Sequence, residues 1–186
     1  MNATLVVIAL FCGILLGALA IYIIQQNRTR RLKQVFGPEY GRAVGETGNR
    51  SRAEALLSER KKRVQQLQIR ELSPTERARF HEDWRDIQAQ FVDDPNRALT
   101  EADRVIREVM SAQGYPVREF EEQAADISVD HASVIENYRE GHNIALRNLQ
   151  GHATTEDLRK AMIHYRILFE ELAGRAESAH AERIRL

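Results

Sequence analysis

Two hydrophobic patterns divide the chain. Residues 3–24 form an apolar run without a charged side chain, whereas apolar residues after Ser51 recur every three or four positions. As a helix, the run would be about 33 Å long at ~1.5 Å per residue, enough for a hydrocarbon core of about 30 Å. The later spacing is typical of amphipathic helices, and no long alternating strand pattern interrupts it. The pattern predicts an all-α protein, with an N-terminal transmembrane helix over 3–24, a linker and an antiparallel helical bundle.

Local start signals place the helices of the predicted bundle. A side-chain oxygen before the first turn accepts a backbone hydrogen bond, and proline fits the first helical position. An acidic residue three positions after the cap completes a capping box. The signals are Ser73-Pro74-Thr75-Glu76, Asp94-Pro95, Ser128 or Asp130, and Thr154-Thr155-Glu156-Asp157.

Glycine and charge set the expected domain boundaries. Residues 25–50 are a basic juxtamembrane segment and a linker that contains four of the ten glycines. Proline at 38 favours an extended residue before it, which supports a break there. The helical bundle is expected over 51–174, with its first helix at about 51–72. Residues 175–186 form a polar tail.

The basic residues after the apolar run predict its orientation. Arg28, Arg30, Arg31 and Lys33 follow Ile24 closely, and no Lys or Arg precedes the run. Because basic flanks stay inside, we expect the N-terminus outside a bacterial cell membrane and the C-terminal domain in the cytoplasm. The same four side chains are candidates for contact with anionic lipids. Cleavage after the small residues around Ala20 is the alternative, but a basic stretch before the run is missing.

Small residues form a strip within the predicted span. Ala9, Gly13 and Gly17 lie four positions apart, so they share one side of a helix. Such a strip lets two transmembrane helices approach closely. It therefore predicts a homodimer through the membrane helix.

Charge is balanced overall and uneven along the chain. The 27 basic and 27 acidic residues cancel, but residues 25–70 hold 12 basic and 4 acidic ones. The content of 43% hydrophobic and 29% charged residues excludes a disordered chain. Nucleic-acid binding through residues 50–70 is an alternative function, although no aromatic residue lies among these basic ones and the rest of the chain is acidic.

Motifs for catalysis are weak in this sequence. One cysteine, at position 12, cannot form an internal disulfide or a cysteine-rich zinc site. His81-Glu82 begins like a zinc-protease helix, but Arg85 stands where the second histidine is needed. No cofactor, metal or catalytic residue is predicted, and we expect a protein that is not an enzyme.

One group of polar residues remains a candidate site. Two acids and a histidine are close in sequence, and further histidines and a tyrosine follow at helical spacing. They suggest either a small acid–histidine or metal pocket, or a set of local hydrogen bonds. The residues are Asp126, Asp130, His131, Tyr138, His142 and His164.

Several blocks resemble a family of uncharacterised bacterial single-pass membrane proteins. They are Phe36-Gly-Pro-Glu-Tyr40, Phe91-Val-Asp-Asp-Pro95, Gly114-Tyr-Pro116, Ala124-Ala-Asp-Ile-Ser-Val-Asp-His131, Thr155-Glu-Asp-Leu-Arg159 and His164-Tyr-Arg166. The resemblance implies a single-pass anchored helical domain and supplies no activity or site residue. The expected function is a membrane-anchored scaffold or adaptor for a protein partner. A metal-binding or enzymatic domain around Asp130, His131 and His142 is the second alternative.

Overall fold

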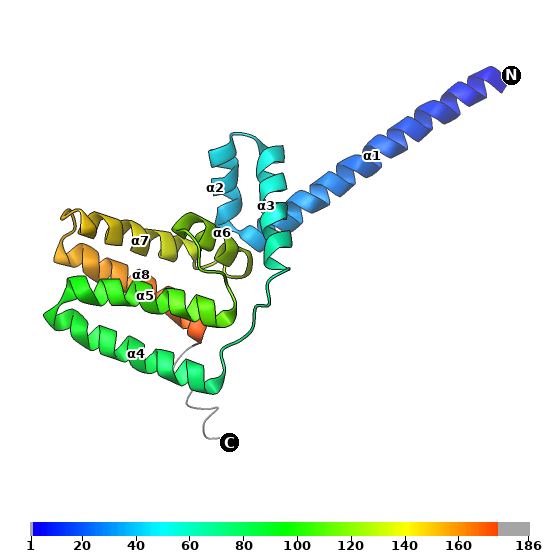
Figure 1. Ribbon diagram of the computed structural model, residues 1–186. Helices are drawn as coiled ribbons and strands as arrows, with labels where there is room; N and C mark the ends of the chain where they lie inside the picture. The colour runs from blue at the N-terminus through cyan, green and yellow to red at the C-terminus, as the bar shows by residue number, and fades with distance from the viewer. Residues whose placement is uncertain (1, 175–186) are drawn as a thin grey trace. The chain divides into compact units, whose positions relative to one another are not determined.

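The computed structural model describes residues 2–174, except for the side chains of residues 2–10 and 12. Within this range the chain is all-α, as predicted, with eight helices and no strand (Figure 1). The helices are α1 Asn2–Phe36, α2 Pro38–Thr47, α3 Arg50–Val64, α4 Pro74–Asp93, α5 Pro95–Gln113, α6 Phe120–Asp130, α7 Ile135–Leu149 and α8 Thr155–Ala173. The chain divides into two compact units, Met1–Ser58 and Glu59–Leu186, with the boundary inside α3.

The predicted linker in the first unit is helical. α2 lies between Gly37, with φ +48°, and Gly48, with φ +60°. Both dihedrals fall where only glycine is free of strain, and Pro38 takes the first helical position. The glycine count had suggested a flexible segment. In fact two glycines end helices, while Gly41 and Gly45 lie on exposed positions of α2.

The predicted span 3–24 lies in the first two-thirds of α1. Over the described residues, no helix combines the length and the hydropathy that crossing a membrane requires. Part of the predicted span, including the side chain of Ala9, falls outside the described side chains. The side chains from Phe11 to Ile24 that are described are exposed, including Ile14, Leu16 and Ile24.

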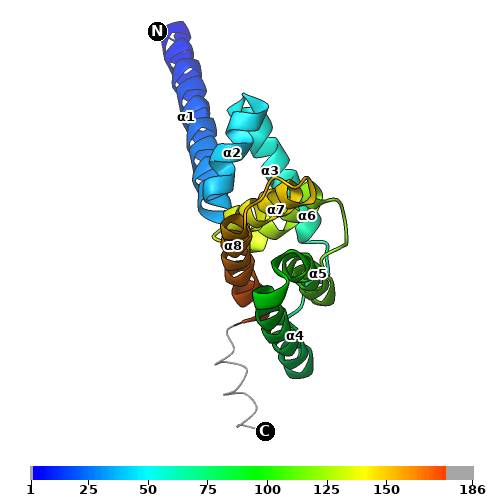
Figure 2. The ribbon, with the colours of Figure 1, turned by 90° about the vertical axis from the view of Figure 1, so that its left-hand side faces the viewer.

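Four long helices build the core of the second unit. α4 packs on α5, α5 on α8 and α8 on α7, whereas the pairs α4–α8 and α5–α7 touch at few points. Figure 2 shows α4 and α5 side by side. Trp84 is buried in α4 and stacks on Phe169 of α8 with ring centroids 4.6 Å apart. The 3–4 spacing of the apolar residues is thus explained by one continuous core.

Three of the four start signals form as predicted. Capping boxes close at Ser73–Glu76 and Thr154–Asp157, and Asp94 accepts from the backbone N–H of Arg97. The expectation for Ser128 or Asp130 is wrong, because α7 begins at Ile135 without a side-chain cap. The Ser128 hydroxyl instead donates to the carbonyl of Ala125 in its own helix.

The first bundle helix is shorter than predicted. α3 ends at Val64, and an extended segment leads to Ser73. The backbone N–H of Arg70 donates to the carbonyl of Gln113 at 2.9 Å, which ties this segment to the end of α5. A Cβ on Gly114 would lie 2.5 Å from the Gln68 carbonyl oxygen. The segment between α3 and α4 therefore packs closely against the backbone at the end of α5.

Candidate functional site

The six predicted polar residues differ in the side chains that they contact. Asp126 is buried on α6, where its Oδ1 accepts hydrogen bonds from Arg63 Nε at 2.9 Å and Nη2 at 2.5 Å. Tyr138 is buried on α7 and donates its hydroxyl to Gln123 Oε1 at 3.2 Å. The two side chains are therefore held by different partners.

The residues at the end of α6 have separate partners as well. Asp130 accepts a hydrogen bond from the hydroxyl of Tyr115 at 2.9 Å. His131 Nδ1 lies 3.1 Å from Oε1 of Glu171 on α8. The sequence proximity of Asp130 and His131 thus does not produce an acid–histidine pair.

The two remaining histidines are also apart in their contacts. His164 Nδ1 lies 2.9 Å from Asn137 Oδ1. His142 stacks on Phe120 with ring centroids 3.6 Å apart and 7° between the planes. Over the described residues, no group of three His, Cys, Asp or Glu side chains is arranged to hold a metal ion.

The structure builds a different polar centre on α5, around Asp103. Its Oδ1 accepts a hydrogen bond from the hydroxyl of Tyr165 at 3.1 Å, and its Oδ2 lies 2.5 Å from Arg107 Nη2. Both carboxylate oxygens are therefore engaged by donors. His142 faces the same region, because Asp103 and Arg107 both act on its charge.

This centre borders a pocket between α5 and α7, two helices that touch at few points. The pocket has a volume of about 230 Å³. Its lining contains both polar and apolar side chains. The residues are Leu99, Thr100, Asp103, Arg107, His142, Ala145, Leu146, Asn148 and Leu149.

Burial fixes the protonation states around the pocket. It raises the pKa of the Tyr165 and Tyr138 hydroxyls, and the negative charge of Asp103 adds to the effect. Both phenols therefore remain donors at neutral pH. Burial lowers the pKa of His142 below its ordinary value of 6.5, so the imidazole is neutral and one ring nitrogen can accept a hydrogen bond.

A glycine makes room for the tyrosine that holds Asp103. Gly141 lies on α7 beside the ring of Tyr165, and a Cβ there would be 2.6 Å from Tyr165 Cε1. Only a residue without a side chain allows the ring this position. Gly141 is therefore part of the support of the Asp103 centre.

The pocket presents apolar side chains and one neutral imidazole. Asp103 is occupied by Tyr165 and Arg107, so it does not orient His142 as a base. A group with an apolar body and a hydrogen-bond donor would match the leucines and the neutral imidazole. Tyr and Trp side chains have this combination and are common anchors of protein interfaces.

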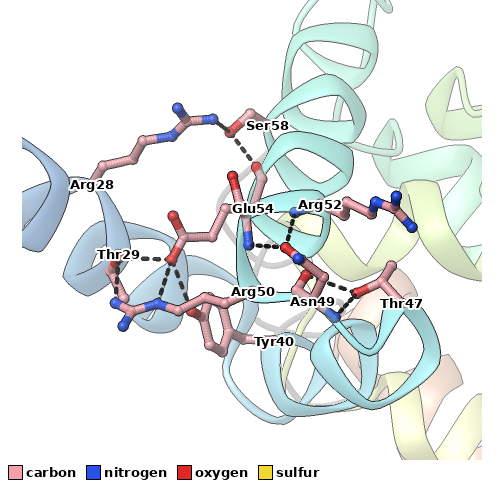
Figure 3. A network of polar contacts seen from close by, with 10 residues as sticks. Arg28, Thr29, Tyr40, Thr47, Asn49, Arg50, Arg52, Glu54 and Ser58 are labelled. Atoms are coloured by element: carbon pink, nitrogen blue, oxygen red, sulfur yellow. Dashed lines mark hydrogen bonds and ion pairs between the residues drawn. The ribbon is translucent and has the colours of Figure 1, made fainter.

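The first unit has its own polar network, centred on Glu54 (Figure 3). Oε1 of Glu54 accepts hydrogen bonds from Thr29 at 2.7 Å, Tyr40 at 2.9 Å and Arg50 at 3.0 Å. These residues come from α1, α2 and α3, so one carboxylate joins all three helices. Burial alone would raise the pKa of Glu54, but the hydrogen bonds outweigh it and the pKa lies below its ordinary value.

The basic residues predicted to touch lipid differ in their surroundings. Arg28 donates to Ser58 Oγ at 3.1 Å, and Lys33 lies over the ring of Tyr40 at 5.4 Å. Arg30 and Arg31 are exposed on α1. A Cβ added at Gly13 or Gly17 would meet nothing within 4 Å, so this side of α1 is open within the described chain.

Sequence reasoning missed the residues that matter most in both networks. Asp103 and Arg107 are an ordinary i, i+4 pair on a surface helix, and nothing in the pattern distinguishes them. Glu54 and Thr29 are 25 positions apart, and the predicted linker separated them. The available signal was the spacing of Leu32, Phe36, Tyr40 and Ala43, four buried residues that lie three or four positions apart.

Comparison of the chain with protein-family models, with curated proteins and with solved structures yields no match. The functional argument therefore rests on the geometry of the two units.

Proposed function

We propose that this protein is a membrane-anchored helical adaptor that binds a protein partner. The observation that carries the proposal is the exposed apolar part of α1. From Phe11 to Ile24, all the described large apolar side chains of this helix are about half exposed or more. A helix that is apolar on every side needs an apolar environment all round it, and a lipid bilayer provides one.

The basic side chains after Ile24 support an orientation with the N-terminus outside and the folded part in the cytoplasm. The bacterial single-pass family that the sequence resembles agrees with an anchor of this kind. A close approach of two α1 helices along Gly13 and Gly17 would make the adaptor a dimer.

The pocket between α5 and α7 supports a role in binding a protein. Leu149 is 79% exposed and Leu146 is 44% exposed at its rim. Exposed leucines at an apolar pocket can receive an anchor side chain from a protein partner. We therefore place the partner's contact at this pocket.

Two measurements test the proposal. Carbonate washing of membranes from cells that express the full chain should leave it in the membrane fraction. A photo-crosslinking amino acid in place of Leu149 should then give one discrete adduct, and mass spectrometry should identify the same protein in repeated captures. Val117 is the matched control, since it is 71% exposed and outside the pocket.

Release of the chain by carbonate would rule out the anchor. Equal adducts at Leu149 and Val117 would show that the pocket has no special role. A third variant, Leu146→Arg in the presence of the crosslinker at Leu149, should abolish the specific adduct, because the charge would stand in the apolar rim.

A further inference from the structure

The first unit turns the chain back toward the start of α1. Gly48 ends α2, and Asn49 starts α3 by accepting from the backbone N–H groups of Ser51 and Arg52 at 2.9 and 3.1 Å. Both ribbon views show the α2–α3 turn directed to the same side as the N-terminal end of α1 (Figures 1 and 2). We call residues 48–52 the hairpin tip.

Side-chain contacts fix where α3 lies along the axis of α1, and we call this position the level of α3. Arg50 Nη2 donates to Thr29 Oγ1 at 2.7 Å, and Arg28 Nη2 donates to Ser58 Oγ at 3.1 Å (Figure 3). Two neighbouring residues of α1 therefore contact both ends of the stretch from Arg50 to Ser58. α3 crosses α1 at this level.

The level corresponds to the headgroup layer of a bilayer. Thr29 follows Ile24 by five residues, which is about 7.5 Å along a helix. Each headgroup layer is roughly 5–8 Å thick outside the hydrocarbon core. If the apolar part of α1 ends in the hydrocarbon at Ile24, Arg50 lies among the phosphates, and the tip points further toward them.

The charges at this level favour anions. Arg50 pairs with Glu54 through Nε at 3.0 Å but keeps 59% of its side chain exposed. Arg52 is exposed, and the first turn of α3 contains no acidic residue. Arg30 and Arg31 add two exposed guanidinium groups from α1. Over the described residues, Arg52, Arg30 and Arg31 have no acidic partner, whereas Arg28 and Lys33 contact Ser58 and Tyr40.

We propose that the hairpin tip is a binding surface for the phosphate groups of anionic phospholipids. Arg50 and Arg52 of α3 bind the headgroups together with Arg30 and Arg31 of α1. The inference rests on the proposed membrane anchor and adds a second contact that the sequence did not indicate. Guanidinium groups suit phosphate because their planar donors match two oxygens at once.

A nucleic acid is the other polyanion that these arginines could meet. The position argues for lipid, since the tip lies beside the end of the apolar part of α1. Figure 3 labels one aromatic side chain in this network, Tyr40, whose hydroxyl is bound to Glu54. Its ring lies under Lys33 rather than in an open groove where a base could stack.

Lipid selection by the full-length chain tests the surface. The protein is reconstituted into nanodiscs of equal phosphatidylglycerol and phosphatidylcholine, and the lipids retained after mild detergent stripping are quantified by mass spectrometry. The wild type should enrich phosphatidylglycerol. Arg52→Gln should lower that enrichment about fivefold, the factor for ~1 kcal/mol per basic residue near an anionic surface.

Two further variants separate a loss of charge from a loss of structure. Glu54→Gln removes a negative charge at the same level and keeps an acceptor oxygen, so it should raise the enrichment. Arg166→Gln on α8 is a control, since its side chain is also half exposed, and it should change nothing.

Three results would overturn the proposal. If the anchored wild type and Arg52→Gln enrich phosphatidylglycerol equally, the hairpin tip does not bind the lipid, and only the basic residues of α1 do. A DNA duplex at equal phosphate concentration that displaces phosphatidylglycerol would favour the nucleic acid. A chain that carbonate removes from membranes would refute the anchor, and the lipid surface with it.

Discussion

Asp103 shows how a single residue can organise a pocket. Its two oxygens hold Tyr165 and Arg107, and its charge influences Tyr138 and His142. These side chains come from α5, α7 and α8, and the pocket itself is lined by α5 and α7. Removing this carboxylate would leave a buried phenol without its acceptor, so the residue is structural even if the pocket binds nothing.

Replacement of Gly141 by alanine tests the support of this centre. In a helix the change ordinarily stabilises by about 0.5–1 kcal/mol. Here the new Cβ would meet the buried ring of Tyr165 at 2.6 Å, and we expect a loss of ~1–3 kcal/mol from overpacking. Urea unfolding followed by circular dichroism measures the difference. Gly45→Ala on α2 is the control, because a Cβ there meets nothing within 4 Å, and a stabilised Gly141→Ala protein would contradict the geometry.

Two half-buried histidines predict a pH dependence. Burial lowers the pKa of both His81 and His142 below 6.5 in the folded chain. The unfolded chain then binds protons more readily than the folded chain. The two neutral histidines therefore contribute their full share to the free energy of unfolding above about pH 6.5, and this share is lost as the pH falls through their folded pKa values. The free energy of unfolding should decrease between pH 7 and pH 5. The double variant His81→Gln, His142→Gln should flatten this dependence, whereas an unchanged slope would point to other groups.

At the scale of the helices, the sequence was most informative where local chemistry decides. Ser73 with Glu76 and Thr154 with Asp157 form capping boxes, because a cap depends only on residues three positions apart. Ser128 and Asp130 have the right residue types for a cap. They failed as predictions because Ser128 bonds within α6 and Asp130 accepts from Tyr115, which is 15 positions away.

The glycines of the first unit were the larger error. The number of glycines predicts a linker only if every glycine is taken to make the chain flexible. Here the glycines at the helix ends and those inside the helix have different structural roles. Gly37 and Gly48 occupy positive-φ positions at the two ends of α2, and the helix between them buries Tyr40 and Ala43. The stabilising contacts of α2 come from distant residues such as Glu54, which no local pattern of residues 36–50 contains.

The candidate site could be predicted only in part for the same reason. His142 was identified from its spacing to His131 and Tyr138, and it does line the pocket. Asp103, Arg107 and Phe120 approach it from other helices, and single-sequence spacing does not report such contacts. The six residues mostly bind to different side chains, although Tyr138 and His142 both pack on Phe120.

For the whole molecule, the compartment of the second unit decides which partners it can meet. The basic residues that follow Ile24 bias the chain in one direction. A green fluorescent protein fused after Leu186 should therefore fluoresce, and an alkaline phosphatase fused there should be inactive. Transferring the positive charge to the other side of the apolar run tests whether that charge sets the orientation. Arg28, Arg30, Arg31 and Lys33 changed together to Gln, with three Lys added before Ala3, should invert both readouts. Active phosphatase on the unaltered chain would place the second unit outside, where its partner would be extracytoplasmic and a nucleic-acid function would be excluded.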